Sequence, residues 1–142
     1  MTKPATPLDA AEIQAMLDAS PFISTLGLTV TKADPEAQEV TMVMPLKPEF
    51  ERGAGTGQFH GGPIASFIDV IGDYVLVMSV GGGVPTINFR TDFLRPAISP
   101  KLTATARVRR AGRTVGLVDI DVFDDKDRLV AVGRGTYAMQ VG

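Results

Sequence analysis

The stretch FHGGPIASFIDVIGDYVLVMSV, residues 59–80, decides the fold of this chain. It holds the only histidine, two adjacent glycines and a proline, and it continues as seventeen mostly apolar residues without lysine or arginine. A helix that is apolar on nearly every side is stable only where other elements cover it. Two aspartates, Asp69 and Asp73, nevertheless lie within this run, and a buried carboxylate needs a physical reason.

The same run is the candidate for a membrane span in this sequence. Its length is close to the lower limit of about 17 residues for a transmembrane helix, and each central Asp opposes insertion by roughly 2.5–3.5 kcal/mol. We therefore expect a buried helix in a soluble protein, with no membrane partner. Residues 1–16 contain no apolar segment of a secretory signal, and the chain has no cysteine, so we expect a cytoplasmic location.

The composition is that of an ordinary globular domain. The 142 residues are 44% hydrophobic and 21% charged, which suits one domain with a substantial core. The formal net charge of -2 provides no positive field, so we expect no nucleic-acid partner. The absence of cysteine excludes disulfides, thiolate nucleophiles and cysteine-ligated zinc.

Residues 1–20 are predicted to form an N-terminal helical segment. Asp9 and Glu12 have the spacing of a capping box, and apolar residues follow at helical spacing between residues 13 and 17. This pattern predicts a short amphipathic helix that ends before Pro21.

The rest of the chain is predominantly β. Residues 22–45 predict two strands around a turn at Asp34-Pro35, and residues 46–58 predict a loop. Four further strands are predicted at residues 86–96, 101–110, 114–124 and 128–140. In the second of these, alternation places Leu102, Ala104, Ala106 and Val108 on one face and Thr103, Thr105, Arg107 and Arg109 on the other. Tight turns between the last three strands predict an antiparallel meander.

One long apolar helix and five or six antiparallel strands define the expected architecture. The simplest way to cover the helix is a curved antiparallel β-sheet that wraps around it. This is the hotdog architecture, an α+β fold, and we expect residues 21–142 to form a single hotdog domain. The sequence contains no internal repeat and no interdomain linker.

Asp69 and Asp73 are four residues apart and therefore lie on one face of the helix. Either this face borders a water-filled groove or a subunit interface, where Asp73 pairs with an arginine, or the carboxylates are catalytic groups in a mostly apolar pocket. The preceding residues favour catalysis. Pro63 suits the first helical turn, and Gly61 and Gly62 let a ligand approach the first-turn amides, which can stabilise an oxyanion.

The order of these motifs resembles a known family. HGG followed by an acid nine residues after the histidine, on a long central helix, is similar to the PaaI-like hotdog acyl-CoA thioesterases. The segment PTINFRTDFLRPA, residues 85–97, resembles the family's strand that ends in an aromatic-x-x-Pro pattern. Residues 102–138 resemble the family's closing hairpins, so that the resemblance extends over about residues 20–140.

The resemblance implies hydrolysis of an acyl-CoA thioester without a cofactor. Asp69 matches the catalytic acid, which acts as nucleophile or as base for the attacking water. The Gly61 N–H matches the group that polarises the thioester carbonyl, and Thr86 matches a hydroxyl that helps to place the water. His60 matches a loop histidine that organises the turn at Gly61, and Asp73 lies where some relatives carry a polar residue near the catalytic acid.

One position departs from the family pattern. Many relatives carry Asn or Gln six residues before the histidine, and here that residue is Ala54. Either Gln58 supplies the polar group from a different position, or the site is wetter, slower or adapted to another substrate. Gln58 and Gly62 are therefore named as candidate substrate-binding residues.

Four arginines are candidates for contacts with the phosphates of coenzyme A, because guanidinium groups bind phosphate through paired hydrogen bonds. They are Arg107, Arg109, Arg110 and Arg113. The alternative is a solvated strand surface with a charged turn, and the sequence does not separate the two.

The sequence gives weaker support to other kinds of functional site. The segment GAGTGQFHGG is no dinucleotide-binding fingerprint, because His60 occupies the third glycine position. Ser66 lies about 9 Å along the helix axis from His60, which disfavours a catalytic triad with Asp69. One histidine and two aspartates make a poor metal site, so we expect neither a metal nor a cofactor.

Helix geometry adds one independent inference. Gly61 and Asp69 are separated by roughly 12 Å of helical rise, whereas an oxyanion donor and a catalytic acid must both lie within about 3 Å of the reacting centre. If both act, they come from different chains related by a two-fold axis. We therefore expect a homodimer, or a tetramer of dimers, that hydrolyses acyl-CoA. The alternatives are a hotdog enoyl-acyl hydratase and a non-catalytic acyl-CoA-binding module.

Overall fold

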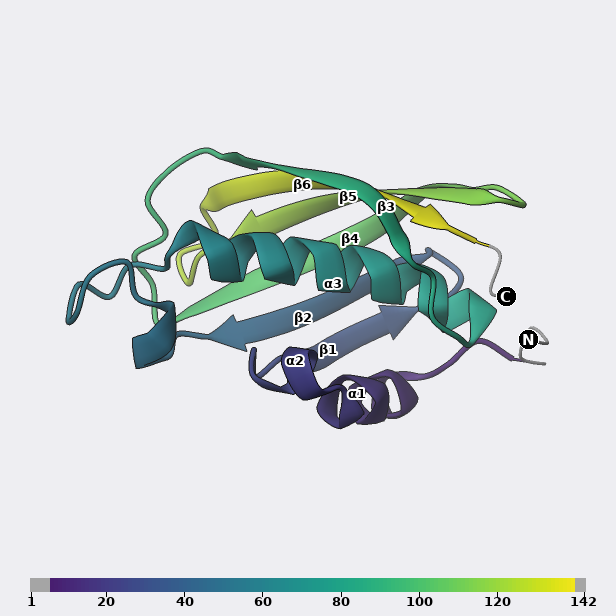
Figure 1. Cartoon of the computed structure of the whole chain (residues 1–142), viewed down its shortest axis with the longest axis horizontal. Helices are drawn as coiled ribbons and strands as arrows, with labels where there is room; N and C mark the ends of the chain where they lie inside the picture. The colour runs from purple at the N-terminus through teal and green to yellow at the C-terminus, as the bar shows by residue number, and fades with distance from the viewer. Residues whose placement is uncertain (1–5, 140–142) are drawn as a thin grey trace.

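The computed structural model describes residues 6–139, in which a long helix lies along one face of an antiparallel sheet (Figure 1). The helices are α1 (Ala10–Ala19), α2 (Pro21–Ser24) and α3 (Gly61–Val80), with a short 3-10 helix, η1 (Pro48–Phe50). The strands are β1 (Thr29–Asp34), β2 (Glu39–Pro45), β3 (Thr86–Phe93), β4 (Lys101–Ala111), β5 (Val115–Phe123) and β6 (Leu129–Ala138). The predicted segments 1–20 and 21–142 include residues 1–5 and 140–142, which lie outside the described residues.

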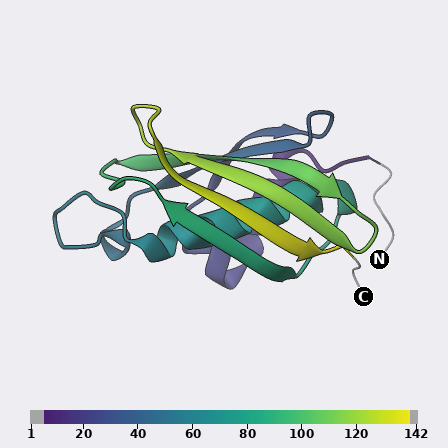
Figure 2. The same ribbon diagram turned by 90° about the horizontal axis from the view of Figure 1, so that it is seen from above.

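The six strands form one sheet in the order β1-β2-β4-β5-β6-β3, and all neighbouring pairs are antiparallel. The predicted meander of the last three strands is therefore confirmed. β3 directly follows α3 in the chain but pairs with β6, so β1 and β3 form the two edges of the sheet, and α3 runs across its inner face (Figure 2). This arrangement confirms the predicted hotdog fold.

The central helix α3 has well-defined ends. His60 is its N-cap, and Gly81 ends it in a left-handed conformation (φ 83°), which glycine adopts without steric cost. Its length and apolar composition would also suit a membrane span, but most of the helix is buried inside the protein, as in the core helix of a soluble protein. The sheet does not enclose α3 completely. Its half-buried residues include Ala65, Ser66, Asp69 and Asp73.

The two faces of the sheet differ in chemistry as the sequence predicts. Leu102, Ala104 and Ala106 of β4 are fully buried beneath α3. On the outer face, five charged residues lie directly opposite one another in adjacent strands. This charged row consists of Glu39, Arg107, Asp119, Arg134 and Arg90.

Ion pairs join two neighbouring pairs of the charged row, and Arg90 pairs instead with Asp92. Arg107 contacts Glu39 at 3.1 Å, and Asp119 contacts Arg134 at 2.7 Å and Arg109 at 3.3 Å. The hydrogen bond from Arg134 is the main reason why the pKa of Asp119 lies below its usual range. Exposed pairs of this kind each contribute at most about 1 kcal/mol to the free energy of unfolding.

The N-terminal region partly differs from the prediction. The capping box at α1 is confirmed, because the Asp9 carboxylate accepts the Glu12 N–H at 2.8 Å and the Glu12 carboxylate accepts the Asp9 N–H at 2.8 Å. The predicted strand at residue 22 is wrong, since Pro21–Ser24 forms α2 and β1 begins only at Thr29. Pro21 occupies the first turn of α2, where its fixed φ and missing N–H favour a helix.

A buried tyrosine fixes α3 against the sheet. The hydroxyl of Tyr137 on β6, which is fully buried, donates a hydrogen bond to the backbone carbonyl of Asp69 at 3.0 Å. Two glycines make room for this ring, because a Cβ atom at Gly72 or at Gly135 would overlap its hydroxyl. The middle of α3, and with it Asp69, is therefore positioned directly by β6.

The close approach of Tyr137 makes Gly72→Ala a test of this packing. An alanine gains up to about 1 kcal/mol in helix propensity, but overpacking a core costs about 1–3 kcal/mol. We expect urea denaturation to give a net loss in the free energy of unfolding. Gly83→Ala is the matched control, since no atom lies within 4 Å of the added Cβ at that position. An equal effect of both substitutions would contradict the role assigned to Tyr137.

Candidate active site

Asp69 and Asp73 lie on the incompletely covered side of α3 and line the same groove. This groove has a volume of about 510 Å³. Its walls come from the chain around α2, from α3 and from β3, and they are mostly apolar. The lining residues are Ser20, Phe22, Ile23, Ala65, Ser66, Asp69, Val70, Asp73 and Phe89.

Thr86 makes the principal polar contact to Asp69. Its hydroxyl donates a hydrogen bond to the Asp69 carboxylate at 2.8 Å. A register shift between β3 and β6 leaves Ile87 without a Cα partner, between Thr86 opposite Tyr137 and Asn88 opposite Thr136. Because a shift of this kind reverses the alternation of side chains, Thr86 can face α3 on the same side as the odd-numbered residues that follow it.

Asp73 is the electrostatically unusual group of the groove. One of its carboxylate oxygens is buried and has no hydrogen-bond partner among residues 6–139. Burial, and next the charge of Asp69, raise the pKa of Asp73 to about 7, while the backbone N–H of Val84 acts in the opposite direction. A carboxyl group of this kind exchanges its proton near neutral pH. None of the ion pairs between described residues of one chain includes Asp73, so the predicted pairing with an arginine at a subunit interface stays a prediction.

The N-terminus of α3 presents a free amide. The Nδ1 atom of His60 accepts the Gly62 N–H at 3.3 Å, and the His60 N–H donates to the Phe50 carbonyl at 2.7 Å. The Gly61 N–H occupies the first helical position, and the hydrogen bonds found among the described residues leave it unpaired. Such an N–H, at the positive end of the helix dipole, is suited to bind an oxyanion.

A second cavity, of about 430 Å³, lies beside Gly61. It is lined in part by Gln58, Phe93, Arg52 and Arg95. Ala54, which replaces the expected Asn or Gln, is exposed in the preceding turn and does not line this cavity. Of the two positions considered from the sequence, Gln58 is therefore the one that presents a polar side chain beside Gly61.

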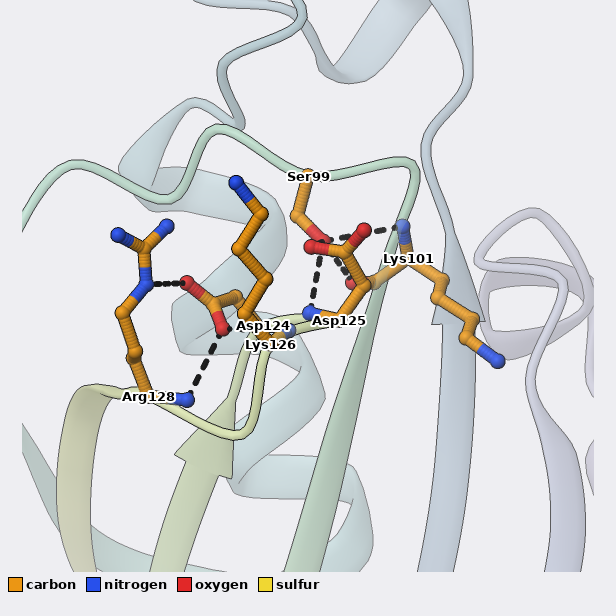
Figure 3. A network of polar contacts seen from close by, with 6 residues as sticks. All are labelled: Ser99, Lys101, Asp124, Asp125, Lys126 and Arg128. Atoms are coloured by element: carbon orange, nitrogen blue, oxygen red, sulfur yellow. Dashed lines mark hydrogen bonds and ion pairs between the residues drawn. The ribbon is translucent and has the colours of Figure 1, made fainter.

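A polar network holds the loop that delivers Gly61 (Figure 3). The carboxylate of Asp124, which is 2% exposed, accepts the N–H groups of Lys126 and Arg128 at 2.9 Å and contacts Arg128 Nε at 2.8 Å. The adjacent Asp125 N–H donates to the hydroxyl oxygen of Ser99 at 3.1 Å. The β5–β6 turn is thereby fixed to the segment that follows β3.

The same segment pairs with the loop before α3. The Ser99 N–H donates to the Gly57 carbonyl at 3.2 Å, and the Phe59 N–H donates to the Ala97 carbonyl at 2.9 Å. His60 and Gly61 follow directly in the chain. The start of α3 is thus tied through two loops to the β5–β6 turn.

The structure does not bring all predicted site residues together. Asp69 and Asp73 line the groove and Thr86 hydrogen-bonds to Asp69, whereas Gly61 and Gln58 line the second cavity. Arg107 and Arg109 lie on the outer face of the sheet in ion pairs, and Arg110 and Arg113 line a separate cavity at the β4–β5 turn. None of these four arginines lines the groove or the Gly61 cavity.

Several residues that shape the site were not predicted from the sequence. Arg52 and Arg95 line the Gly61 cavity, and a Cβ atom at Gly61 would lie 3.2 Å from Phe93. Tyr137 was missed as well. The available signal was Gly72, because a glycine inside an otherwise apolar helix usually has a packing reason.

The groove is not a metal site by its composition. Within residues 6–139, no group of three or more histidine, cysteine, aspartate or glutamate side chains is placed to hold a metal ion. The functional groups that the groove and the start of α3 present are carboxylates, hydroxyls and backbone amides.

The chain is similar to proteins of known class. Residues 56–131 match the thioesterase superfamily. The chain is 35% identical over 139 residues to a Halobacterium salinarum protein named "Putative esterase", with 90% of each chain covered. It is 30% identical over 122 residues to acyl-coenzyme A thioesterase PaaI of Escherichia coli, and the matched region covers 85% of this chain and 84% of PaaI. The solved structure of Escherichia coli PaaI matches with a TM-score of 0.78 at 27% identity and covers 91% of this chain and 90% of that one.

The fold and these similarities define an enzyme of the hotdog thioesterase class, which hydrolyses thioester bonds. The chain belongs to the thioesterase superfamily and resembles its PaaI-like members.

Proposed function

We propose that this chain hydrolyses acyl-CoA thioesters to a free acid and CoA, with Asp69 as base or nucleophile and the Gly61 N–H as oxyanion donor. The observation that carries the proposal is the Asp69 carboxylate, which accepts the Thr86 hydroxyl at 2.8 Å in a largely apolar groove. The choice of acyl-CoA follows from two relatives, PaaI and the medium/long-chain acyl-CoA thioesterase YigI, both of Escherichia coli.

The proposed chemistry needs one group that takes a proton from water and one that stabilises the negative charge on the carbonyl oxygen. As water attacks the thioester carbonyl, Asp69 takes its proton and negative charge develops on the carbonyl oxygen. The hydrogen bond from Thr86 orients the carboxylate, and the free Gly61 N–H stabilises the oxyanion. If Asp69 attacks the carbonyl directly, the same N–H stabilises the same oxygen.

We propose that each site is completed by a second copy of the chain, in a cytoplasmic homodimer or tetramer of dimers. Within one chain, Asp69 and Gly61 line different cavities. A two-fold axis that sets two α3 helices antiparallel would place the Gly61 of one chain near the Asp69 of the other. Each active site would then take Asp69 from one chain and the Gly61 N–H from the other.

The exposed edge of β3 supports this arrangement. Among the described strands β3 pairs only with β6, and its exposed side chains include Ile87 and Phe93, which are 58% and 55% exposed. An unpaired edge with apolar side chains favours strand addition. Antiparallel pairing of β3 with the same strand of a second copy would extend the sheet and cover these side chains.

The proposal is tested by measuring free-thiol release from a panel of acyl-CoAs that differ in chain length and in aromatic content. We expect at least one substrate to be turned over well above the rate of spontaneous hydrolysis. Hydration of an enoyl-CoA without thiol release would instead favour a hydratase. Tight binding of the panel without turnover would favour an acyl-CoA-binding module.

Arg95 offers a test of CoA recognition, because it lines the Gly61 cavity. If its guanidinium contacts a CoA phosphate, we expect Arg95→Ala to raise KM for CoA esters about tenfold, as for the loss of a charge-assisted hydrogen bond. A pantetheine thioester lacks the 3′-phosphate and the diphosphate, so its KM should change little. Equal losses on both substrates would indicate a structural role.

The same substrate pair tests the four arginines named from the sequence. Arg107, Arg109, Arg110 and Arg113 remain candidates for phosphate contacts, since a second copy of the chain can bring an outer surface near the CoA. We expect a KM effect restricted to CoA esters for each arginine that contacts phosphate. Arg107→Ala also breaks the ion pair with Glu39, so its stability is measured in parallel.

A further inference from the structure

Asp73, the second carboxyl group of the groove, has no role in the proposed reaction of Asp69 and the Gly61 N–H. Asp73 follows Asp69 by one helical turn, and both line the same groove. Side chains four residues apart on a helix have Cβ atoms about 5–6 Å apart, so the two carboxyl groups can exchange a proton directly or through one water. One oxygen of Asp73 is buried without a partner within residues 6–139.

The surroundings of Asp73 favour its neutral form. On α3 its ionisable neighbours are Asp69 and Tyr74, and on β6 the nearest is Tyr137, which already donates to the Asp69 carbonyl. The parts of α2 and β3 that line the groove contribute the uncharged side chains of Ile23 and Phe89. No cation from the described elements balances a negative charge on Asp73. Its burial and the charge of Asp69 raise its pKa to about 7.

Thioester hydrolysis involves two proton transfers, one from the attacking water and one to the departing sulfur. Asp69 removes a proton from water, and the sulfur of CoA gains a proton to become the free thiol, so an acid beside the sulfur can assist its departure. We propose that Asp73 is the general acid that protonates this sulfur. Asp69 then passes the proton that it took from water to Asp73. This inference rests on the proposed thioesterase function.

The proton inventory of this step balances. Water oxygen bonds to the acyl carbon while one water proton passes to Asp69, and the C–S bond breaks as the sulfur takes the proton of Asp73. The products are the carboxylic acid and the free thiol. Asp69 is then protonated and Asp73 ionised, and transfer of one proton between them restores the starting state. If Asp69 acts as nucleophile, its oxygen bonds to the acyl carbon while the C–S bond breaks and the sulfur takes the proton of Asp73. Water then hydrolyses the resulting anhydride, its oxygen bonds to the acyl carbon as Asp69 leaves as a carboxylate, and the ionised Asp73 takes the second water proton.

The test compares two leaving groups that carry the same acyl chain. One substrate is the CoA ester, and the other is the thioester of an electron-poor aromatic thiol, whose thiolate leaves without protonation. We expect Asp73→Asn to lower kcat on the CoA ester by about 10²-fold, as for the loss of a general acid, and to change kcat on the aromatic thioester by less than about threefold. Equal losses on both substrates, or no loss on the CoA ester, would overturn the proposal.

Two further variants separate this proposal from the proposed function. Glu36 is exposed in the β1–β2 turn and does not line the groove, so Glu36→Gln should leave both rates nearly unchanged and controls for the loss of one carboxylate elsewhere in the chain. Asp69→Asn should abolish hydrolysis of both substrates. If Asp69→Asn keeps full activity, the proposed function of Asp69 is wrong, whereas the leaving-group comparison at Asp73 still decides whether Asp73 donates the proton.

A measurement without substrate tests the protonation state of Asp73. A carboxyl whose pKa is raised from 3.8 to about 7 in the folded state keeps its proton where the unfolded chain has lost it. Its contribution to stability is therefore complete below about pH 4 and is lost as the pH rises toward about 7. We expect the free energy of unfolding of the wild type to fall between pH 5 and pH 8 relative to that of Asp73→Asn. The same pH dependence in both proteins would show that Asp73 is ionised throughout and would overturn its role as an acid.

Discussion

Asp69→Asn is expected to lower kcat on the best acyl-CoA substrate by about 10²-fold or more. Asparagine has nearly the same shape as aspartate, and its amide oxygen can still accept the Thr86 hydroxyl that the carboxylate accepts at 2.8 Å. The Tyr137 hydroxyl bonds the backbone carbonyl of residue 69, so this contact is kept. The substitution therefore removes the base or nucleophile and leaves the packing of α3 intact.

The hydrogen bond from Thr86 provides a graded comparison. Thr86→Val removes the hydroxyl and should lower kcat less than Asp69→Asn does, whereas Thr86→Ser keeps the hydroxyl and should retain most activity. Circular dichroism and thiol release are measured for all three variants. Turnover by Asp69→Asn close to that of the wild type would exclude Asp69 from the mechanism.

The mixed-subunit experiment has the second large effect, because activity should reappear from two inactive proteins. Gly61→Pro removes the proposed oxyanion N–H, and Asp69→Asn removes the proposed acid, so each homodimer should be nearly inactive. When equal amounts are refolded together, about half of the dimers should be mixed. If each site uses Gly61 of one chain and Asp69 of the other, a mixed dimer has one intact site, and the mixture recovers roughly a quarter of wild-type activity.

The position of Gly61 makes proline a suitable substitution there. Gly61 is the first residue of α3, where proline is favoured, and His60 before it has the extended backbone that a following proline requires. Gly61→Ala is the matched control, since it places a Cβ atom against Phe93 as proline does but keeps the N–H. Folded mixed dimers without recovered activity would show that each site is built within a single chain.

The elements with strong local patterns could be predicted from the sequence. The apolar run after Pro63 predicts α3 because no other element buries so many consecutive apolar residues. The alternation in residues 101–110 predicts which side of β4 lies in the core, and the spacing of Asp9 and Glu12 predicts the start of α1. Each of these signals is contained within a few residues of the chain.

The features that depend on contacts between distant residues could not be predicted. The register shift at Ile87 is set by the pairing of β3 with β6, and it allows Thr86 to face Asp69. Arg52 and Arg95 reach the Gly61 cavity only because two loops pair before and after α3. Phe22 was expected in a strand, but the preference of Pro21 for a first helical turn prevails over the β-branched residues that follow.

The charged row on the outer face has a consequence for how the chain selects its pairing partners during folding. A slip of one residue between two strands would turn every side chain of the moved strand to the opposite face and place its charge in the core. Burying an unpaired charge costs several kcal/mol, far more than any exposed ion pair contributes. Glu39, Arg107, Asp119 and Arg134 lie on four strands that each have buried positions on the opposite face, so each of the three junctions between those strands carries this penalty for misalignment. The row thus contributes little to the depth of the native free-energy minimum and much to its uniqueness.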